Sequence, residues 1–140
     1  MDVRSSLQGF ARGEVTRAQL ERALSGLVDI DFSGSERRVN HSGDLGVEIE
    51  VRPEDVIGRM QGHLQVEITA EALSEWASAI LMIDAYIWKG HRFQEATRGE
   101  EAWLVLQELS APQVHGEITA ASVHRQIDRL KRKDHRAPAG

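Results

Sequence analysis

Four carboxylates on two alternating segments are the residues of this chain best suited to hold a cation or to bind a basic protein. In VDIDFS, Asp29 and Asp31 alternate with apolar residues, and in VEIEVR, Glu48 and Glu50 do the same. If the two segments pair as strands, the four acids share one face, where like charges opposite each other destabilise the pairing by about 0.2–1 kcal/mol per pair. Folding alone does not favour such a face, so the pattern indicates a surface complementary to a basic protein or a divalent metal ion.

The small number of lysines favours a protein partner over a metal. Carboxylates that hold Mg²⁺ in nuclease-type sites usually have a lysine beside them, and this chain has only Lys89, Lys131 and Lys133. We therefore expect no metal ion and no other cofactor. One alternative is that the strand register keeps the acids apart. Another is that arginines neutralise them, and the candidates are Arg37, Arg38 and Arg52.

Three further residues extend the candidate contact surface. Glu54 and Asp55 follow Pro53 in the first turn of a predicted helix, where the helix dipole favours acids. Trp88 lies at the end of another predicted helix, before KGHRF, and is the tryptophan that we expect to be an exposed anchor. The predicted partner-binding set is Asp29, Asp31, Glu48, Glu50, Glu54, Asp55 and Trp88.

The sequence shows no pattern typical of catalysis. Its six histidines form neither His-x-x-x-His nor His-x-x-Glu-His, and it has no cysteine, so a zinc site is poorly supported. No glycine-rich phosphate loop follows a predicted strand, and Gly-x-Ser-x-Gly is absent. We expect a binding protein and not an enzyme, with an enzyme that lacks a readable motif as a third alternative.

Charge is distributed unevenly along the chain. Residues 124–136 hold six arginines and lysines and two aspartates, a net charge of +4, which leaves −9 for the rest of a chain whose total is −5. An acidic body favours a cationic partner. The basic C-terminal helix supports an alternative function, a regulatory or adaptor protein that binds nucleic acid. We rank it second, because few aromatic side chains are present to stack on bases.

Apolar periodicity predicts about six helices, several of them paired as αα-hairpins. Their expected ranges are Asp2–Ala11, Arg17–Ser25, Pro53–Leu64, Ala70 to about Trp88, Gly99–Ser110 and Ala120 to about Lys133. The related segments EVTR, EITA and EITA each place a threonine where a helix begins: Thr16, Thr69 and Thr119. A threonine hydroxyl accepts hydrogen bonds from the first turn, and the apolar residue before it packs against the residue four positions after it. These threonines are therefore predicted to be structural.

The alternating segments predict a small antiparallel hairpin, with GSERRVNHSGDLG as its long loop. A third strand at His63–Ile68 is the alternative to a helix end there. The expected fold is α+β and helix-dominated, with residues 1–133 forming a single globular domain and residues 134–140 a disordered tail. No apolar run reaches the length of a membrane span and the N-terminus lacks a signal-peptide core, so we expect a cytoplasmic protein without membrane contact.

Asp84 interrupts the apolar stripe of the fourth predicted helix. At 100° per residue it lies in the middle of the stripe that contains Leu73 and Ile80. A buried unpaired carboxylate is too costly, so either the helix bends or ends near Ile83, or Asp84 is paired. Trp76 and Trp103 lie on apolar stripes and are expected in the core.

Two helical segments resemble known inhibitor families. SLQGFARGEVTRAQLERAL resembles the opening of colicin D-type immunity proteins, and GRMQGHLQVEITAEALSEWASAI is similar to segments of small bacterial immunity proteins from toxin-delivery (contact-dependent inhibition) and bacteriocin systems. The resemblance covers roughly residues 3–26 and 56–80 and carries over no inhibitory residue. It implies a small, acidic, non-enzymatic protein that blocks a co-encoded toxin, often a basic nuclease, with acidic residues. An immunity-type inhibitor is therefore the leading expectation.

Overall fold

The computed structural model describes residues 2–32, 37–42, 45–89, 91–92 and 101–135, to which all structural statements below refer. Its elements are, in chain order, α1 (Val3–Ala11), α2 (Arg17–Ala23), β1 (Val28–Asp31), β2 (Arg38–His41), β3 (Ile49–Glu50), α3 (Pro53–Leu64), α4 (Ala70–Met82), β4 (Tyr86–Trp88), β5 (His91–Arg92), α5 (Glu101–Ser110), α6 (Pro112–His115) and α7 (Ala120–His135). This is the expected helix-dominated α+β fold. The predicted disordered tail begins within α7, and residues 136–140 lie outside the described part.

All three predicted threonine caps are present. Thr16 Oγ1 accepts from the backbone N–H of Gln19 at 3.1 Å, and the Gln19 side chain accepts from the Thr16 N–H in return. Thr69 Oγ1 accepts from the N–H of Ala72 at 3.0 Å. Thr119 Oγ1 accepts from the N–H of Ser122 at 3.1 Å. The repeated tetrapeptides are thus one capping device used three times.

The α1–α2 and α3–α4 turns share a second device, a glycine that makes room for the residue before the cap. A Cβ added at Gly9 would lie 2.5 Å from Val15 Cγ2, and one added at Gly62 would lie 2.7 Å from Ile68 Cδ1. The N–H of Glu14 donates to the Gly9 carbonyl at 2.7 Å, and the N–H of Glu67 donates to that of Gly62 at 2.9 Å. Each turn therefore packs an apolar side chain onto a bare helix backbone.

One residue departs from this shared design. The position before each Glu-(Val/Ile)-Thr has a positive φ: +79° at Gly13, +62° at Val66 and +108° at Gly116. Glycine adopts such angles without strain, whereas a β-branched residue there is a genuine outlier. Val66 is moreover 90% exposed, so no packing of its side chain in this chain compensates for the strain.

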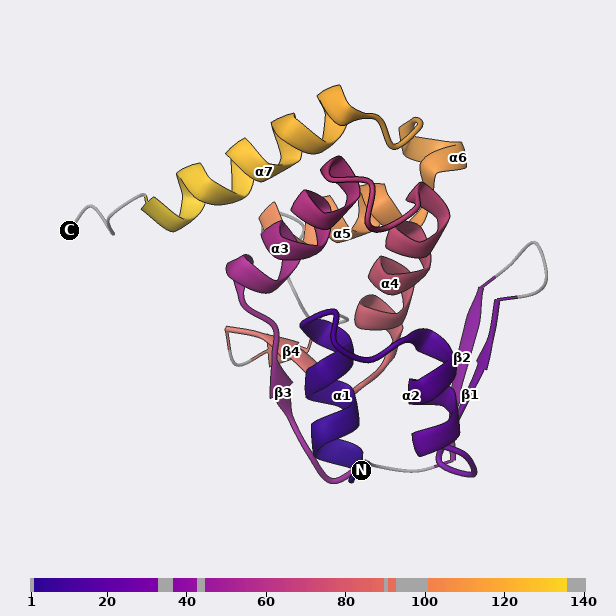
Figure 1. The fold of residues 1–140 in the computed structure, drawn as a ribbon. Helices are drawn as coiled ribbons and strands as arrows, with labels where there is room; N and C mark the ends of the chain where they lie inside the picture. The colour runs from indigo at the N-terminus through magenta and orange to yellow at the C-terminus, as the bar shows by residue number, and fades with distance from the viewer. Residues whose placement is uncertain (1, 33–36, 43–44, 90, 93–100, 136–140) are drawn as a thin grey trace.

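Helices α3, α4 and α5 lie between α7 on one side and the α1–α2 pair on the other (Figure 1). Two buried hydrogen bonds tie α1 to this middle layer. Trp76 Nε1 on α4 donates to the Phe10 carbonyl at 3.0 Å, and the hydroxyl of Tyr86 on β4 donates to the Leu7 carbonyl at 2.6 Å. Trp76 is buried and Trp103 is partly buried against the core, as expected.

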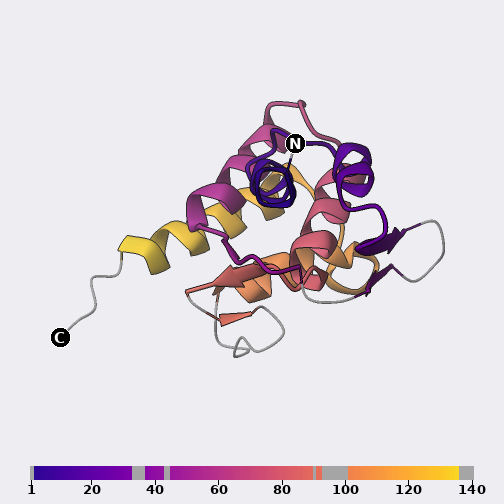
Figure 2. The same ribbon diagram turned by 90° about the horizontal axis from the view of Figure 1, so that it is seen from below.

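The predicted pairing of VDIDFS with VEIEVR is wrong. Strand β1 pairs antiparallel with β2, which lies inside the segment predicted as a loop. Strand β3 instead pairs in parallel with β4, in the region predicted as the end of the fourth helix, and β4 pairs antiparallel with β5. The two small sheets lie on different sides of the α1–α2 pair (Figures 1 and 2). Alternation identified β1 and β3 as strands but could not identify their partners.

The fourth helix is shorter than the predicted range of Ala70 to about Trp88 and ends near Ile83, one of the two alternatives considered for Asp84. Helix α4 stops at Met82 with Ile83 in extended conformation as its C-cap, so Asp84 leaves the apolar stripe. The region predicted as a possible third strand, His63–Ile68, holds the end of α3 and the α3–α4 turn. Helix α5 ends at Ser110, as predicted, and Pro112 begins the short helix α6.

The single tyrosine provides a test of core packing through pH. Burial raises the pKa of Tyr86 well above its ordinary value of 10.0. Above about pH 10 an unfolded tyrosine ionises while Tyr86 stays neutral, so stability should be complete below that pH and fall as pH rises further. Urea unfolding across alkaline pH measures this loss, and Tyr86→Phe should lose less stability over the same range. Equal alkaline losses in both proteins would contradict the buried phenol.

Substitutions in the matched turns should change stability in opposite directions. Val66→Gly relieves the positive-φ strain and should raise the free energy of unfolding by about 1 kcal/mol. Gly13→Ala introduces the same strain and also meets Arg59 Nη1, which lies 2.5 Å from the added Cβ, so it should lower stability. Chemical denaturation of both variants checks the pair. A destabilised Val66→Gly would show that the valine stabilises the turn.

Candidate partner-binding surface

The four acids of the predicted face lie in two separate places. On β1, Asp29 lies across from Asn40 and Asp31 across from Arg38. Glu48 and Glu50 belong to the β3 region, in the other sheet (Figure 1). No acid of this set therefore lies opposite another across a strand pair, and the repulsion expected from the sequence does not arise.

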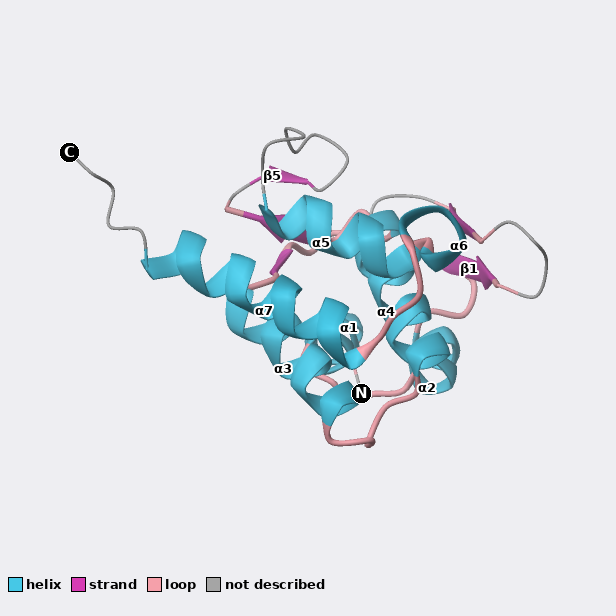
Figure 3. Cartoon of the chain, turned by 90° about the horizontal axis from the view of Figure 1, so that it is seen from above, coloured by secondary structure: helices cyan, strands magenta, loops and turns pink. Residues whose placement is uncertain are grey.

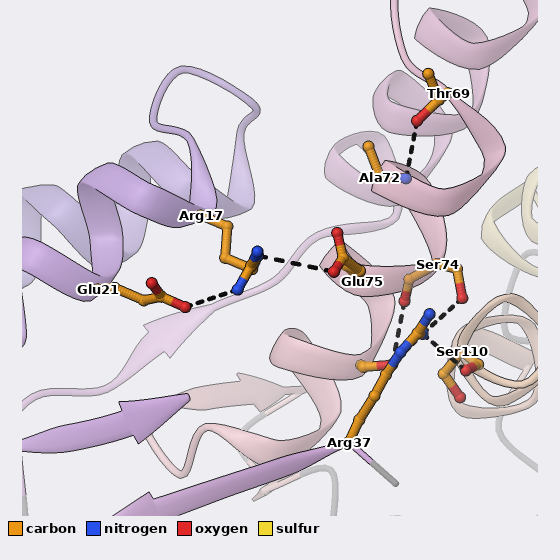
Figure 4. Close-up of polar contacts among 9 residues, drawn as sticks. Arg17, Glu21, Arg37, Thr69, Ala72, Ser74, Glu75 and Ser110 are labelled. Atoms are coloured by element: carbon orange, nitrogen blue, oxygen red, sulfur yellow. Dashed lines mark hydrogen bonds and ion pairs between the residues drawn. The ribbon is translucent and has the colours of Figure 1, made fainter. Parts of the chain in front are cut away.

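Arg37, a predicted neutraliser of these acids, instead anchors the β1–β2 hairpin to the helices (Figure 4). Its Nη1 donates to the hydroxyls of Ser74 and Ser78 on α4, at 2.6 and 2.9 Å, and to the carbonyl of Ser110 at 3.0 Å. Nearby, Arg17 donates to Glu21 at 2.7 Å and lies 3.9 Å from Glu75 (Figure 4). These arginines position elements and leave the predicted acids without a counter-ion from Arg37.

Three of the predicted acids remain together around the start of α3. Glu48, Glu50 and Glu54 are exposed and make no hydrogen bond or ion pair with any other described residue. The one arginine among them, Arg52, is bound to Asp55: its Nη2 donates to Oδ1 at 3.0 Å and its Nε to Oδ2 at 3.4 Å. We call Glu48, Glu50 and Glu54 the β3–α3 acidic patch.

The electrostatics of Arg52 place these charges near one another. The hydrogen bond to Asp55 raises the pKa of the Arg52 guanidinium, and the charges of Asp55, Glu54 and Glu50 raise it further. Residues 48–55 hold four carboxylates and one guanidinium, a net charge of −3. The segment therefore keeps a net negative charge after Arg52 is counted.

Asp55 and Trp88 do not belong to an exposed contact surface. Asp55 is 8% exposed and its Oδ2 accepts from the Arg52 N–H at 2.9 Å, which caps the start of α3. Trp88 is 5% exposed and lies in the hydrophobic core on β4. The expectation of an exposed tryptophan anchor is wrong because α4 ends early and a buried strand follows.

A histidine–aspartate pair resembles catalytic machinery but lacks its geometry. His41 Nε2 accepts from the Asp84 N–H at 3.2 Å, and His41 Nδ1 lies 3.9 Å from Asp84 Oδ2. Both ring nitrogens thus face the same residue, whereas a general base needs one nitrogen directed at the nucleophile. The adjacent Ser42 hydroxyl donates to the carbonyls of Gly26 and Leu27. The pair holds β2 against the end of α4.

Other surfaces carry weaker signals. A hollow of about 490 Å³ between α2 and the β1–β2 hairpin includes Asp29 and Glu21, but Glu21 is already paired with Arg17. No group of three or more His, Asp or Glu residues within the described ranges is arranged to hold a metal ion.

On α7, Arg129 is directed at α5, where it pairs with Glu101 at 3.1 Å and with Glu108 at 2.9 Å. Among the α7 side chains that the structure describes, Arg125 and Lys131 are the exposed cations, and Asp128 is exposed as well. Among the described α7 cations, Arg129 is therefore used within the fold, while Arg125 and Lys131 remain on the surface.

No protein-family model matches the chain, no curated protein matches its sequence and no solved structure matches its fold. Among the helices within the described ranges, none has both the length and the apolar character needed to cross a membrane. Function is therefore inferred from the side chains and surfaces described above.

The structural role of Asp55 separates it from its acidic neighbours. Asp55→Ala removes the acceptor for the Arg52 N–H and should lower the free energy of unfolding by about 1–2 kcal/mol. The exposed, unpaired Glu48 is a matched control, and Glu48→Gln should change stability by less than about 0.5 kcal/mol. Denaturant unfolding of the two variants makes the comparison. Equal small effects would mean that the hydrogen bond from the Arg52 N–H to Asp55 does not contribute to stability.

Proposed function

We propose that this protein is an immunity-type inhibitor, a non-catalytic protein that binds and neutralises a cationic toxin encoded beside it. The observation that carries the proposal is the β3–α3 acidic patch, three exposed carboxylates that form no ion pair with a described residue and have Arg52 as the one cation among them. The acidic character of the body of the chain and the resemblance of its helical hairpins to bacterial immunity proteins point the same way. A basic nuclease-type effector, met in the cytoplasm, is the partner that this surface fits.

The net negative charge of the β3–α3 acidic patch favours binding of a cationic partner and does not help the chain to fold. Like charges held close together raise the local negative potential and attract a positively charged protein before contact. Such steering raises the association rate at low ionic strength and weakens as salt screens the charges, over about 8 Å at 0.15 M. Complementary charges also select a partner, because a surface of the wrong sign is repelled.

The backbone beside the patch has one amide that the β3–β4 pair does not use. The N–H groups of Ile49 and Val51 donate to the carbonyls of Ala85 and Ile87 on the β4 side, so the amide of the intervening Glu50 points away from β4. Among the described strands, β3 pairs only with β4 and is therefore an edge strand of its sheet, with α1 in contact with it. Acids on an edge also keep the strand from pairing with other copies. That protective role predicts no loss of partner binding when the charges are removed.

Removal of the patch charges should abolish protection without unfolding the protein. The triple variant Glu48→Gln, Glu50→Gln, Glu54→Gln keeps the side-chain shapes and deletes three charges. When the neighbouring gene's product is expressed in a bacterial host and stops growth, wild-type protein should restore growth and the triple variant should not. Binding measured with the purified pair should weaken at least about 100-fold, in line with the loss of several close charge pairs.

The matched control deletes the same number of charges elsewhere. Glu14→Gln, Glu117→Gln, Asp128→Asn removes three exposed carboxylates that have no ion pair with a described residue, and it should protect and bind like wild type. Melting temperatures of both triple variants should stay close to wild type. Equal binding by the patch variant and the control, with unchanged salt dependence, would refute the patch as the site. Absence of protection by the wild type would refute the inhibitor function itself.

A further inference from the structure

One face of α3 is exposed along its entire length and begins in the acidic patch. The exposed residues recur every three or four positions and therefore lie on one side of the helix: Glu54, Gly58, Gln61 and Gln65. Val66 follows directly at the end of this face. Helix α3 ends at Leu64 and Val66 lies in the turn after it, so the helical part of the face, from Glu54 to Leu64, is about 15 Å long at 1.5 Å per residue. The opposite side of α3 is buried, with Val56 and Met60 fully enclosed.

Within the described part of the chain, no neighbouring atom explains why position 58 is a glycine. It lies in the middle of a helix, where glycine is among the least favourable residues, and a Cβ added there would meet nothing within 4 Å. By contrast, Gly62 on the same helix makes room for Ile68, and Gly9 on α1 makes room for Val15. A helix glycine that leaves open space above it permits another backbone or ligand to approach closely.

Val66 is the second unexplained residue of this face. It is 90% exposed at φ +62°, at the position that the two sister turns fill with glycine. It borders a mainly apolar hollow of about 360 Å³ whose lining includes Leu64, Ile68 and Ala120. Strain kept at an exposed apolar side chain points to a use of that side chain, since the free fold gains nothing from it.

We propose that the exposed face of α3, from Glu54 to Val66, is the docking surface for a helix of the cationic partner. The inference rests on the proposed function and names the part of the protein that the partner contacts. The partner helix packs directly on the backbone at Gly58 and places an apolar side chain against Val66 and into the adjacent hollow. Basic residues flank that side chain, because exposed carboxylates stand at both ends of the face, Glu54 at one and Glu67 at the other.

The surface fits a heterologous partner better than a second copy of this chain. In a symmetric dimer through this face, Glu54 and Glu67 of one copy would meet the same carboxylates of the other, and like charges at an interface disfavour the contact. A cationic helix meets the same residues with complementary charge. The helical part of the face, about 15 Å long, corresponds to about ten residues of a partner helix.

The test uses substitutions that stabilise the free protein and weaken the complex. Gly58→Ala and Val66→Gly should each raise the melting temperature, by about 2–4 °C for a chain of this size. Affinity for the purified product of the neighbouring gene should nevertheless fall, at least about tenfold for Gly58→Ala and further for the larger Gly58→Gln, because added volume in a packed interface is destabilising. Val66→Gly should also weaken binding about tenfold, since it removes the apolar anchor.

Controls with the same chemistry elsewhere separate docking from general effects. Ala121→Gln adds comparable volume at an exposed position of α7, and Val114→Gly removes an exposed valine, 72% accessible, from α6. Both should leave affinity unchanged. Wild-type affinity in Gly58→Gln and Val66→Gly, while the patch variant fails to bind, would overturn the docking surface and leave the inhibitor function standing. No binding by the wild type would overturn both.

Sedimentation of the free protein decides between the partner and a second copy. The proposal predicts a monomer for the wild type and for every variant at the concentrations used for binding. A wild-type dimer that Gly58→Gln dissociates would overturn the proposal, because the face would then be a self-association surface.

Discussion

The helical part of this fold depends on one close contact, an apolar side chain packed onto a glycine of the preceding helix. Val15 over Gly9 and Ile68 over Gly62 bring the second helix of each hairpin against the first, and the following threonine caps the new helix. Hydrogen bonds from Trp76 on α4 and Tyr86 on β4 to backbone carbonyls of α1 then join the first hairpin to the rest of the fold. Viewed from the α7 side, α7 then lies over the α3 helix (Figure 3). Packing of bare backbone against a branched side chain leaves little freedom for the hairpin angle.

The same contact explains why α3 presents the surface it does. One side of the helix packs into the core through Val56 and Met60, and Gly62 near its end makes room for the α3–α4 turn. The hydrogen bond from the Arg52 N–H to Asp55 caps its N-terminal end, and Glu54 remains exposed near Glu48 and Glu50. What remains free is a single stripe with an acidic start, a bare backbone at Gly58 and a strained valine at the end. Two local choices that weaken the free fold, Gly58 and Val66, lie on or beside that stripe, where a binding role would retain them.

Much of the helical structure was predictable from local chemistry, and the strand pairing was not. Thr16, Thr69 and Thr119 cap helices through contacts within three residues, so sequence was sufficient to place them. The partner of β1 depends on a contact between distant segments, and the polar sequence RVNH gave little sign of a strand. Tyr86–Trp88 was assigned to a helix because its apolar residues continue the stripe of α4, although Asp84 had already marked the end.

In the candidate site, too, features set by local sequence were predictable and features set by distant contacts were not. Exposure of Glu48, Glu50 and Glu54 followed from alternation and from their place at a helix start, but burial of Trp88 followed from a parallel strand pair that no local pattern predicts. Val66 and Gly58 were missed. Alignment of the segments GEVT, VEIT and GEIT would have marked Val66 as the exception to two glycines. For Gly58 the signal was absent, since only the structure distinguishes a glycine with open space from one that accommodates a neighbour.

The central claim is that the surface from the β3–α3 acidic patch along α3 to Val66 is where a cationic partner binds. Amide relaxation caused by a soluble paramagnetic probe reports, residue by residue, which parts of a surface lose contact with solvent when a complex forms. With the neighbouring gene's product bound, relaxation should fall at Glu50, Gly58 and Val66 and stay unchanged at Asp29 and Asn40. Loss of solvent contact at Asp29 and Asn40, with Gly58 and Val66 unaffected, would contradict the account.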